Sequence, residues 1–336
     1  MSANANAVQA QRPRASARTH VGGLHITRRG IQVALGWIWL LDGLLQFQSF
    51  MYSHAFIAEV IEPTAEGQPG FIHNPILKFA HFYAHDITLW NTLSAEIQLA
   101  IGLGLIFGGR WVRPALFASF FWAAVVWWFG EGFGTLFSGA PVSPLMGAPG
   151  AAFLYLMIGL LVWPKDDNAP GKPVDGGLLG RFGGRIVWSL VWAEAAVLWL
   201  LHVDRTKNAI KSQITEMAEA SPHWLATNLH SVATDFGGDG TSTATVLAIL
   251  SVLIAIGVWT RARPVALSVG VVLALLYWIY GQALGGPFWE GSATDVNTAP
   301  LLILLAATVW IVPKPATSTV SARERVPQRE VSVGAT

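Results

Sequence analysis

Four ionisable side chains in the first half of the chain could take part in catalysis: Asp42, His85, Glu96 and Glu131. Asp42 and Glu96 interrupt long apolar runs, where a carboxylate costs several kcal/mol unless it is paired, hydrated or protonated. Their spacing from the ends of these runs predicts a similar depth, roughly 12–15 Å inside the membrane at 1.5 Å per residue. Two carboxylates in one cavity would share a proton, because the pKa of one of them rises. A continuous helix would also place Glu96 three turns beyond His85 on nearly the same stripe.

His81 and His85 are four residues apart, so a helix places them on one face. Such a pair can chelate copper or zinc when further ligands join it, here Asp42, His73 or Glu131. Interfacial hydrogen bonding is the alternative for the two histidines. For the buried acids, the alternative is a structural hydrogen bond to a neighbouring helix.

The run WWFGEGFG, residues 127–134, ends an apolar stretch with an acid between glycines. An acid at a helix C-terminus meets the negative end of the helix dipole, which is unfavourable without compensation. Gly132 and Gly134 allow the backbone to approach a ligand closely, or merely another helix. Together with Trp128 they are the candidate cofactor-binding residues, and Glu131 joins the candidate catalytic set.

The elements that must position these side chains are membrane-spanning helices. The 336 residues are 53% hydrophobic and 12% charged, about half the charged fraction of a soluble domain. The 16 tryptophans are amphipathic side chains of the kind that gathers at membrane interfaces. The pattern predicts an all-α membrane protein with eight transmembrane helices, at 31–50, 87–107, 114–130, 149–163, 186–202, 242–259, 264–281 and 299–312.

Composition and charge exclude several kinds of chemistry and predict the orientation of the chain in the membrane. The chain has no cysteine, which excludes disulfides, thiolate nucleophiles and cysteine-ligated iron–sulfur clusters. Its net charge of +1 gives no indication of a nucleic-acid partner. With both termini cytoplasmic, 17 of the 21 Lys and Arg residues lie on the cytoplasmic side, which predicts this orientation in a bacterial-type cytoplasmic membrane. The predicted outer segments are 51–86, 131–148, 203–240 and 282–298, so a site among the acids would face outward.

Self-similarity at a period of about 150 residues divides the chain. RWVRP at 110–114 recurs as RARP at 261–264, and the run around Glu131 matches the run around Gln282. Two four-helix repeats with parallel orientation are therefore predicted. The predicted domains are a disordered cytoplasmic tail at 1–29, repeat 1 at 30–164, a cytoplasmic linker at 165–184, repeat 2 at 185–313 and a second disordered cytoplasmic tail at 314–336.

The fourth span of each repeat is short and follows a Gly-rich and Pro-containing segment, at 131–150 and at 285–298. These segments are predicted to dip into the outer leaflet, because irregular backbone is tolerated there only when it is buried in protein or lines a cavity. An ordinary outer loop is the alternative. Since Gln282 replaces Glu131 in the second repeat, activity is assigned to the first repeat and a scaffold role to the second.

Residues 91–121 resemble the DoxX-like superfamily of four-helix membrane proteins, including its DoxD and MauE types. The shared pattern is an acid in the second span, a Gly-rich helix end, a basic turn and a Pro-Ala start to the next span, here Glu96, Gly102, Gly104, Gly108, Gly109, Arg113, Pro114 and Ala115. The resemblance implies a tandem duplication of the family's unit. One branch of the family is a subunit of a thiosulfate:quinone oxidoreductase, and another is associated with methylamine utilisation.

Three functions are compatible with this pattern. The first is a redox protein or subunit that exchanges electrons or protons with a quinone, which suits aromatic walls and a deep acid. The second is a non-enzymatic anchor or assembly subunit for an extracytoplasmic protein partner. The third is a proton-coupled carrier of a solute or a metal ion. In all three, the lipid bilayer surrounds the protein.

Overall fold

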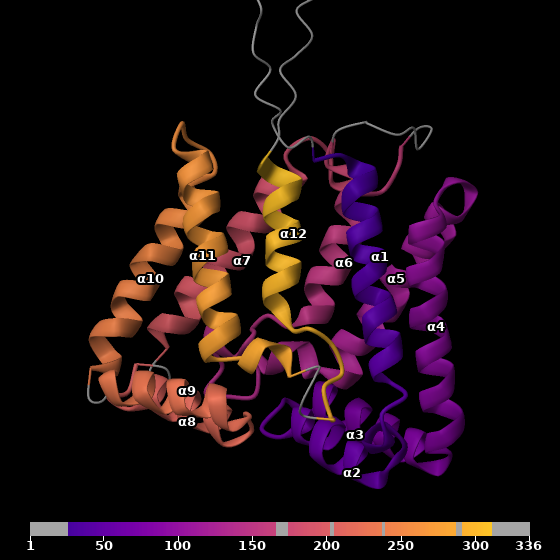
Figure 1. Cartoon of the computed structure of the whole chain (residues 1–336), viewed down its shortest axis with the longest axis horizontal. Coiled ribbons are helices and arrows are strands. Elements are labelled where there is room, and N and C mark those ends of the chain that lie inside the picture. Colours follow the sequence, from indigo (N-terminus) through magenta and orange to yellow (C-terminus); the bar gives the residue numbers. More distant parts are fainter. Residues whose placement is uncertain (1–25, 166–173, 202–204, 237–238, 287–290, 311–336) are drawn as a thin grey trace, which may run out of the picture.

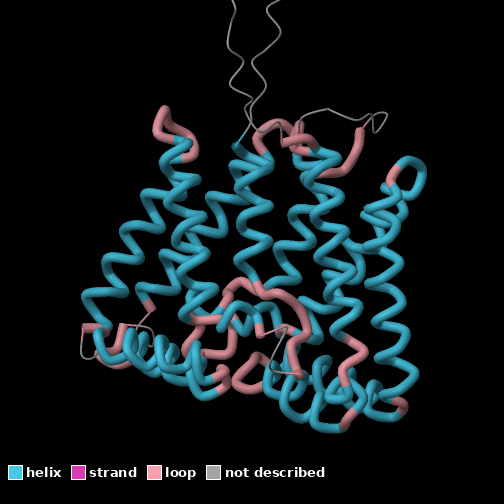
Figure 2. Tube along the Cα trace, viewed as in Figure 1, coloured by secondary structure: helices cyan, strands magenta, loops and turns pink. Residues whose placement is uncertain are grey.

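The computed structural model describes residues 26–165, 174–201, 205–236, 239–286 and 291–310. Within these ranges the chain forms helices and connecting loops, and it contains no strand (Figure 2). The predicted disordered tails, apart from residues 26–29, and residues 166–173 of the predicted linker lie outside the described residues. The first helix begins at Arg28 and the first helix after the linker begins at Gly183, each two residues before the predicted start of its repeat. The division into two repeats stays a prediction.

Eight helices run side by side, one for each predicted span (Figure 1). In chain order they are α1 (Arg28–Leu45), α4 (Ile87–Phe107), α5 (Val112–Val125), α6 (Ala151–Leu161), α7 (Gly183–Leu200), α10 (Gly240–Gly257), α11 (Arg263–Tyr280) and α12 (Thr298–Trp310). Five stretches are long and apolar enough to cross a membrane: Ile87–Phe107, Gly109–Gly130, Gly183–Leu200, Gly240–Gly257 and Arg263–Tyr280. Helices α6 and α12 are apolar but shorter.

The outward sides of these helices are also apolar. Phe121 is 53% exposed, Leu190 61% and Leu253 60%. Large apolar side chains in such positions are unfavourable in water, whereas lipid accepts them without cost. Helix length, composition and exposed apolar faces are thus those of a multi-pass membrane protein, as the sequence predicted.

Four further helices lie across one end of this bundle (Figure 1): α2 (His54–Phe56), α3 (Gly70–His85), α8 (Ala209–Glu219) and α9 (His223–Asp235). The described residues of all four predicted outer segments gather at this end, which we call the outer end. Helix α1 begins, and α12 ends, at the opposite end. The predicted topology is consistent with this grouping. The side of the membrane that this end faces stays a prediction.

The helices pack in the same order in both repeats. Helix α1 contacts α4, α4 contacts α5 and α5 contacts α6, as α7 contacts α10, α10 contacts α11 and α11 contacts α12. Helices α6 and α12 meet in the middle of the molecule, and α12 also contacts α1 and α7 (Figure 1). Small residues allow the closest approach, since a Cβ on Gly36 of α1 would lie 2.9 Å from the Gly102 carbonyl oxygen of α4. Superposition of the two repeats stays a prediction.

The irregular segments before α6 and α12 share an unusual backbone. Residues 132–135 all have positive φ angles, and so do residues 283–286, which lie 151 positions later. The indole of Trp127 donates to the Pro149 carbonyl at 3.0 Å, and that of Trp278 donates to the Val296 carbonyl at 2.9 Å. A left-handed turn of this kind costs roughly 1–2 kcal/mol for each non-glycine residue. Such a turn persists only where the surrounding structure holds it.

Each irregular segment crosses to the other repeat. The amide of Gln48, just after α1, donates to the Ala293 carbonyl at 2.9 Å. In the opposite direction, the Ser143 hydroxyl donates to the Gln213 side-chain oxygen of α8 at 2.7 Å. The segments lie beneath the short helices α6 and α12 and above the crosswise helices (Figure 2). These two segments are the predicted dipping loops. Their insertion into the outer leaflet of the membrane stays a prediction.

Candidate functional site

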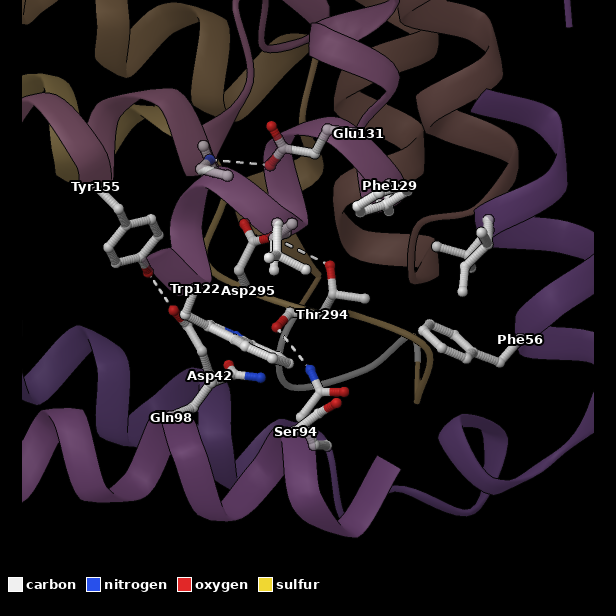
Figure 3. A pocket seen from close by; sticks show the side chains of 18 of the residues that line it. Asp42, Phe56, Ser94, Gln98, Trp122, Phe129, Glu131, Tyr155, Thr294 and Asp295 are labelled. Atoms are coloured by element: carbon white, nitrogen blue, oxygen red, sulfur yellow. Dashed lines mark hydrogen bonds between the residues drawn. The ribbon is translucent and has the colours of Figure 1, made fainter. Parts of the chain in front are cut away.

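A cavity of about 130 Å³ lies among the outer ends of α1, α4, α5 and α6 (Figure 3), and α3 contributes Phe79 and Tyr83 to its lining. Rings form much of its wall: Trp39, Phe56, Phe79, Tyr83, Trp122, Phe129 and Tyr155. Its polar lining includes Asp42, Gln46, Ser94, Gln98, Glu131, Thr294 and Asp295. The lining contains three carboxyl groups and no Lys, Arg or His. We call this space the aromatic cavity.

Asp42 is the least exposed of the three acids, at 2%. The Tyr155 hydroxyl of α6 donates a hydrogen bond to one of its carboxylate oxygens, Oδ2. The tyrosine is held in turn by Trp39, whose ring centroid lies 4.3 Å away and whose indole donates to Ser119 at 3.0 Å. The other carboxylate oxygen, Oδ1, has no hydrogen-bond partner among the described residues. Asp42 therefore presents a free acceptor in an aromatic surrounding.

Glu131 follows the last turn of the third span, η5 (Val126–Gly130), as predicted. A hydrogen bond compensates its unfavourable position at the negative end of that helix dipole. Oε1 of Glu131 accepts from the Ala152 amide at 2.9 Å, in the first turn of α6. Burial raises the pKa of Glu131 to about 8, with a further contribution from Asp295, and the amides of Ala152 and Ala151 oppose the rise. Its second oxygen, Oε2, has no partner among the described residues.

Gln282 performs the capping part of this role in the second repeat. Its side-chain oxygen accepts from the Thr298 amide at 3.3 Å and from the Thr298 hydroxyl at 3.1 Å, at the start of α12. The two residues are 151 positions apart, as the repeat predicts. A neutral amide therefore suffices to cap the short helix, so the charge of Glu131 is not required for that structural task.

Asp295 belongs to the second repeat and lies between Asp42 and Glu131 in Figure 3. Its carboxylate accepts from the Asn297 amide at 2.5 Å and from the Thr294 hydroxyl at 3.0 Å. Burial raises its pKa, and these two hydrogen bonds oppose the rise. The lining of the cavity is therefore composite, because it includes a residue of the second repeat. The assignment of activity to the first repeat and of a scaffold role to the second stays a prediction. Asp295 stands in a loop without periodicity, so no spacing could have identified it.

Two of the four predicted catalytic residues do not reach the aromatic cavity. Glu96 is exposed on α4, because Ser94 and Gln98 face the cavity and the residue midway between them points to the opposite side of the helix. His85 is exposed at the end of α3. Asp86, with φ −147° and ψ 76°, separates α3 from α4 and caps α4 by accepting from the Leu89 amide. The continuous stripe predicted from His85 to Glu96 is therefore wrong.

His81 and His85 both stand exposed on α3, whose buried face is formed by other residues. Among the described residues, no group of three or more His, Asp or Glu side chains is placed to hold a metal ion. Asp42 and Glu131 line the aromatic cavity instead of joining the histidines. Within the described part of the chain, the two histidines have no third ligand placed beside them. Binding of copper or zinc at this pair stays a prediction.

The three predicted cofactor-binding residues have separate positions. Trp128 is 38% exposed and stacks on Phe129, which lines the aromatic cavity. Gly132 packs against the outer segment, since a Cβ there would lie 2.5 Å from the Thr64 carbonyl oxygen. Gly134 lines a second cavity described below. Trp39 and Trp122 are the tryptophans that border the aromatic cavity, and periodicity alone did not distinguish them from other interfacial rings.

In the second repeat, the place that corresponds to the aromatic cavity is filled by a side chain of the first repeat. Gly130 borders the cavity, and the nearest atom to a Cβ there would be in Val126 at 3.5 Å. At Gly281, 151 residues later, a Cβ would lie 2.1 Å from the Leu145 carbonyl oxygen and 2.4 Å from its Cγ. The buried side chain of Leu145 occupies that space. The asymmetry predicted from Glu131 and Gln282 thus extends to the packing.

A second cavity, of about 340 Å³, lies beside the first and is bordered by the irregular segments of both repeats. Its lining includes Gly134, Thr135, Ser143, Met146 and Asn297, and no aromatic ring. Glu131 and Asp295 border both cavities. We call this space the loop cavity.

Comparison with protein-family models, with curated proteins and with solved structures gives no match for this chain.

Proposed function

We propose that this chain is an eight-span membrane protein of the DoxX-like type that binds a quinone or quinol ring in the aromatic cavity and exchanges protons with it. The observation that carries the proposal is the combination of Asp42 and Glu131, each with a free carboxylate oxygen, in a cavity walled by aromatic rings. The DoxX-like pattern of residues 91–121 supports the quinone assignment by resemblance.

The size and hydrogen-bonding groups of the cavity suit such a ring. Its volume of about 130 Å³ is close to that of engineered apolar cavities that hold one benzene molecule. A quinol hydroxyl can donate to Asp42 or Glu131, and the buried indole of Trp122, which has no acceptor among the described residues, can donate to a quinone oxygen. A carboxyl group whose pKa is near neutral can take up and release such protons. Electrons would come from a separate partner or cofactor, and an extracytoplasmic protein docked at the outer end is the simplest source.

Binding of decylubiquinone, a short-chain quinone, to the purified protein tests the proposal. We expect Asp42→Asn and Glu131→Gln to weaken binding at least about tenfold, since each change removes a charged acceptor or proton carrier. Both changes preserve the shape of the side chain, and Gln282 shows that an amide can cap a short helix here. Titration calorimetry in mild detergent measures the dissociation constant.

Glu96→Gln is the matched control, because it removes a carboxylate from the exposed face of α4, outside the lining of the cavity. Its affinity for the quinone should equal that of the unaltered protein. Equal affinities for all four proteins would refute the quinone site.

The absence of Lys, Arg and His from the cavity lining favours one alternative, a proton-coupled carrier for a small organic cation. Aromatic faces together with carboxylates recognise quaternary ammonium groups through cation–π attraction. Tetramethylammonium should then bind in place of decylubiquinone and lose affinity in Asp42→Asn. A protein that binds the quinone and ignores tetramethylammonium would exclude the carrier.

The predicted topology, with both termini cytoplasmic, would put the outer end on the extracytoplasmic side. Because the chain has no native cysteine, a Ser138→Cys variant carries a single thiol, in the irregular segment before α6. We expect a membrane-impermeant maleimide to label this thiol in intact cells, while Arg261→Cys, in the turn between α10 and α11, is labelled only after the membrane is opened. The reverse pattern would invert the topology.

A further inference from the structure

The loop cavity differs from the aromatic cavity in its chemistry. Hydroxyl, amide and carboxyl groups and short backbone turns border it, and its volume of about 340 Å³ has room for several water molecules. Pro141, on its border, is exposed at the surface of the molecule. A polar space of this size that reaches the surface fills with water rather than with an apolar ligand.

The two cavities meet at Glu131 and Asp295, whereas Asp42 borders the aromatic cavity alone. Oε1 of Glu131 is held by the Ala152 amide, and Oε2 lies against Gly150, where a Cβ would come within 2.0 Å of it. Gly150 belongs to the border of the loop cavity. The free oxygen of Glu131 therefore lies on the loop-cavity side of the carboxyl group, while its other face borders the aromatic cavity.

A buried carboxyl group can titrate only if a path of hydrogen-bonding groups or water molecules connects it to solvent. Aromatic and aliphatic walls carry no proton, so a proton moves through groups or water molecules within hydrogen-bond reach of one another. The groups that face Glu131 across the cavities are Asp295, Asp42 and Tyr155, and none of them is basic. Of the two cavities, the loop cavity has no aromatic ring in its lining and extends from these groups to the exposed Pro141.

We infer that the loop cavity is the aqueous path by which the carboxyl groups of the aromatic cavity exchange protons with the outer side, and that Glu131 and Asp295 are the shared relay groups. This inference rests on the proposed function, because proton exchange with a bound quinone is the reason why protons must reach these carboxyl groups. It adds that the two repeats act jointly, since each supplies one of the relay acids. It also separates the entry of protons from the entry of the ring-shaped ligand.

Chemical access to Glu131 tests the path without any quinone. A Met146→Cys variant places a single thiol on the border of the loop cavity only, and Met146 is partly exposed. The charged thiol reagent sulfonatoethyl methanethiosulfonate should label it and obstruct the cavity. A water-soluble carbodiimide is then added, and mass spectrometry measures the modification of Glu131 and Asp295 against that of the exposed Glu59.

We expect labelling at Met146→Cys to lower the carbodiimide modification of Glu131 and Asp295 at least tenfold and to leave Glu59 unchanged. Ser138→Cys, which borders neither cavity, should accept the same reagent without this protection. Val142→Cys supplies a second border position if Met146→Cys does not fold. Unchanged modification of Glu131 in a labelled border variant, or a border thiol that the charged reagent does not reach, would overturn the path. Because the readout is independent of ligand binding, a failed quinone titration and a failed protection experiment are distinguishable.

Discussion

Replacing Gly150 by alanine should destabilise the protein by about 2–5 kcal/mol. Gly150 has φ +100° and ψ 149°, a backbone conformation that is nearly restricted to glycine. A Cβ would also lie 2.0 Å from Oε2 of Glu131, so the carboxylate would have to leave its position at the N-terminus of α6. The midpoint of thermal unfolding in detergent, followed by tryptophan fluorescence, measures the loss.

Gly139→Ala separates the two causes. Gly139 also has a positive φ, +72°, but a Cβ there would meet nothing within 4 Å. This control should show only the backbone penalty, roughly 1–2 kcal/mol. Combining Gly150→Ala with Glu131→Ala should cost less than the sum of the single changes, because the clash is then gone. Equal losses for Gly150→Ala and Gly139→Ala would show that the carboxylate does not occupy this position.

The stability of the protein should fall as the pH rises from about 4.5 to about 8. The fold raises the pKa of Glu131 from its ordinary 4.5 to about 8, so between these values the folded protein binds more protons than the unfolded chain. Stability then decreases with rising pH by up to about 1.4 kcal/mol per pH unit for one such group. Below pH 4.5 the contribution is complete, and above pH 8 it has been lost. Asp295 shifts in the same direction and adds to the slope.

Glu131→Gln should reduce this slope by up to about 1.4 kcal/mol per pH unit, the share of one group, because the amide keeps the hydrogen bond to Ala152 and does not titrate. Glu96→Gln, on the exposed face of α4, should leave the slope as it is. Thermal unfolding at a series of pH values in one detergent compares the three proteins. A slope that is unchanged in Glu131→Gln would show that Glu131 does not contribute, and Asp295→Asn would then test the neighbouring acid.

Membrane character and helix positions could be predicted from the sequence because they depend on local properties. An apolar run of sufficient length has to form a helix in lipid, since no water is present to satisfy its backbone groups. All eight runs correspond to helices, and the short fourth helix of each repeat was expected from its length. Asp42 and Glu131 were identified for a similar reason, because a carboxylate next to an apolar run stands out whatever surrounds it.

Which acids meet was decided only by the tertiary structure. Glu96 has the same membrane-depth signature as Asp42, yet it faces outward, since the face that a helix buries depends on its neighbours. His85 was separated from Glu96 by the single non-helical residue Asp86. Asp295 and Tyr155 reach Asp42 from 253 and 113 residues away, through the packing of α6 and the crossing loop of the second repeat. The position of an acid along an apolar run can be predicted from the local sequence. The pairing of side chains across helices depends on tertiary contacts, which a local sequence pattern does not predict.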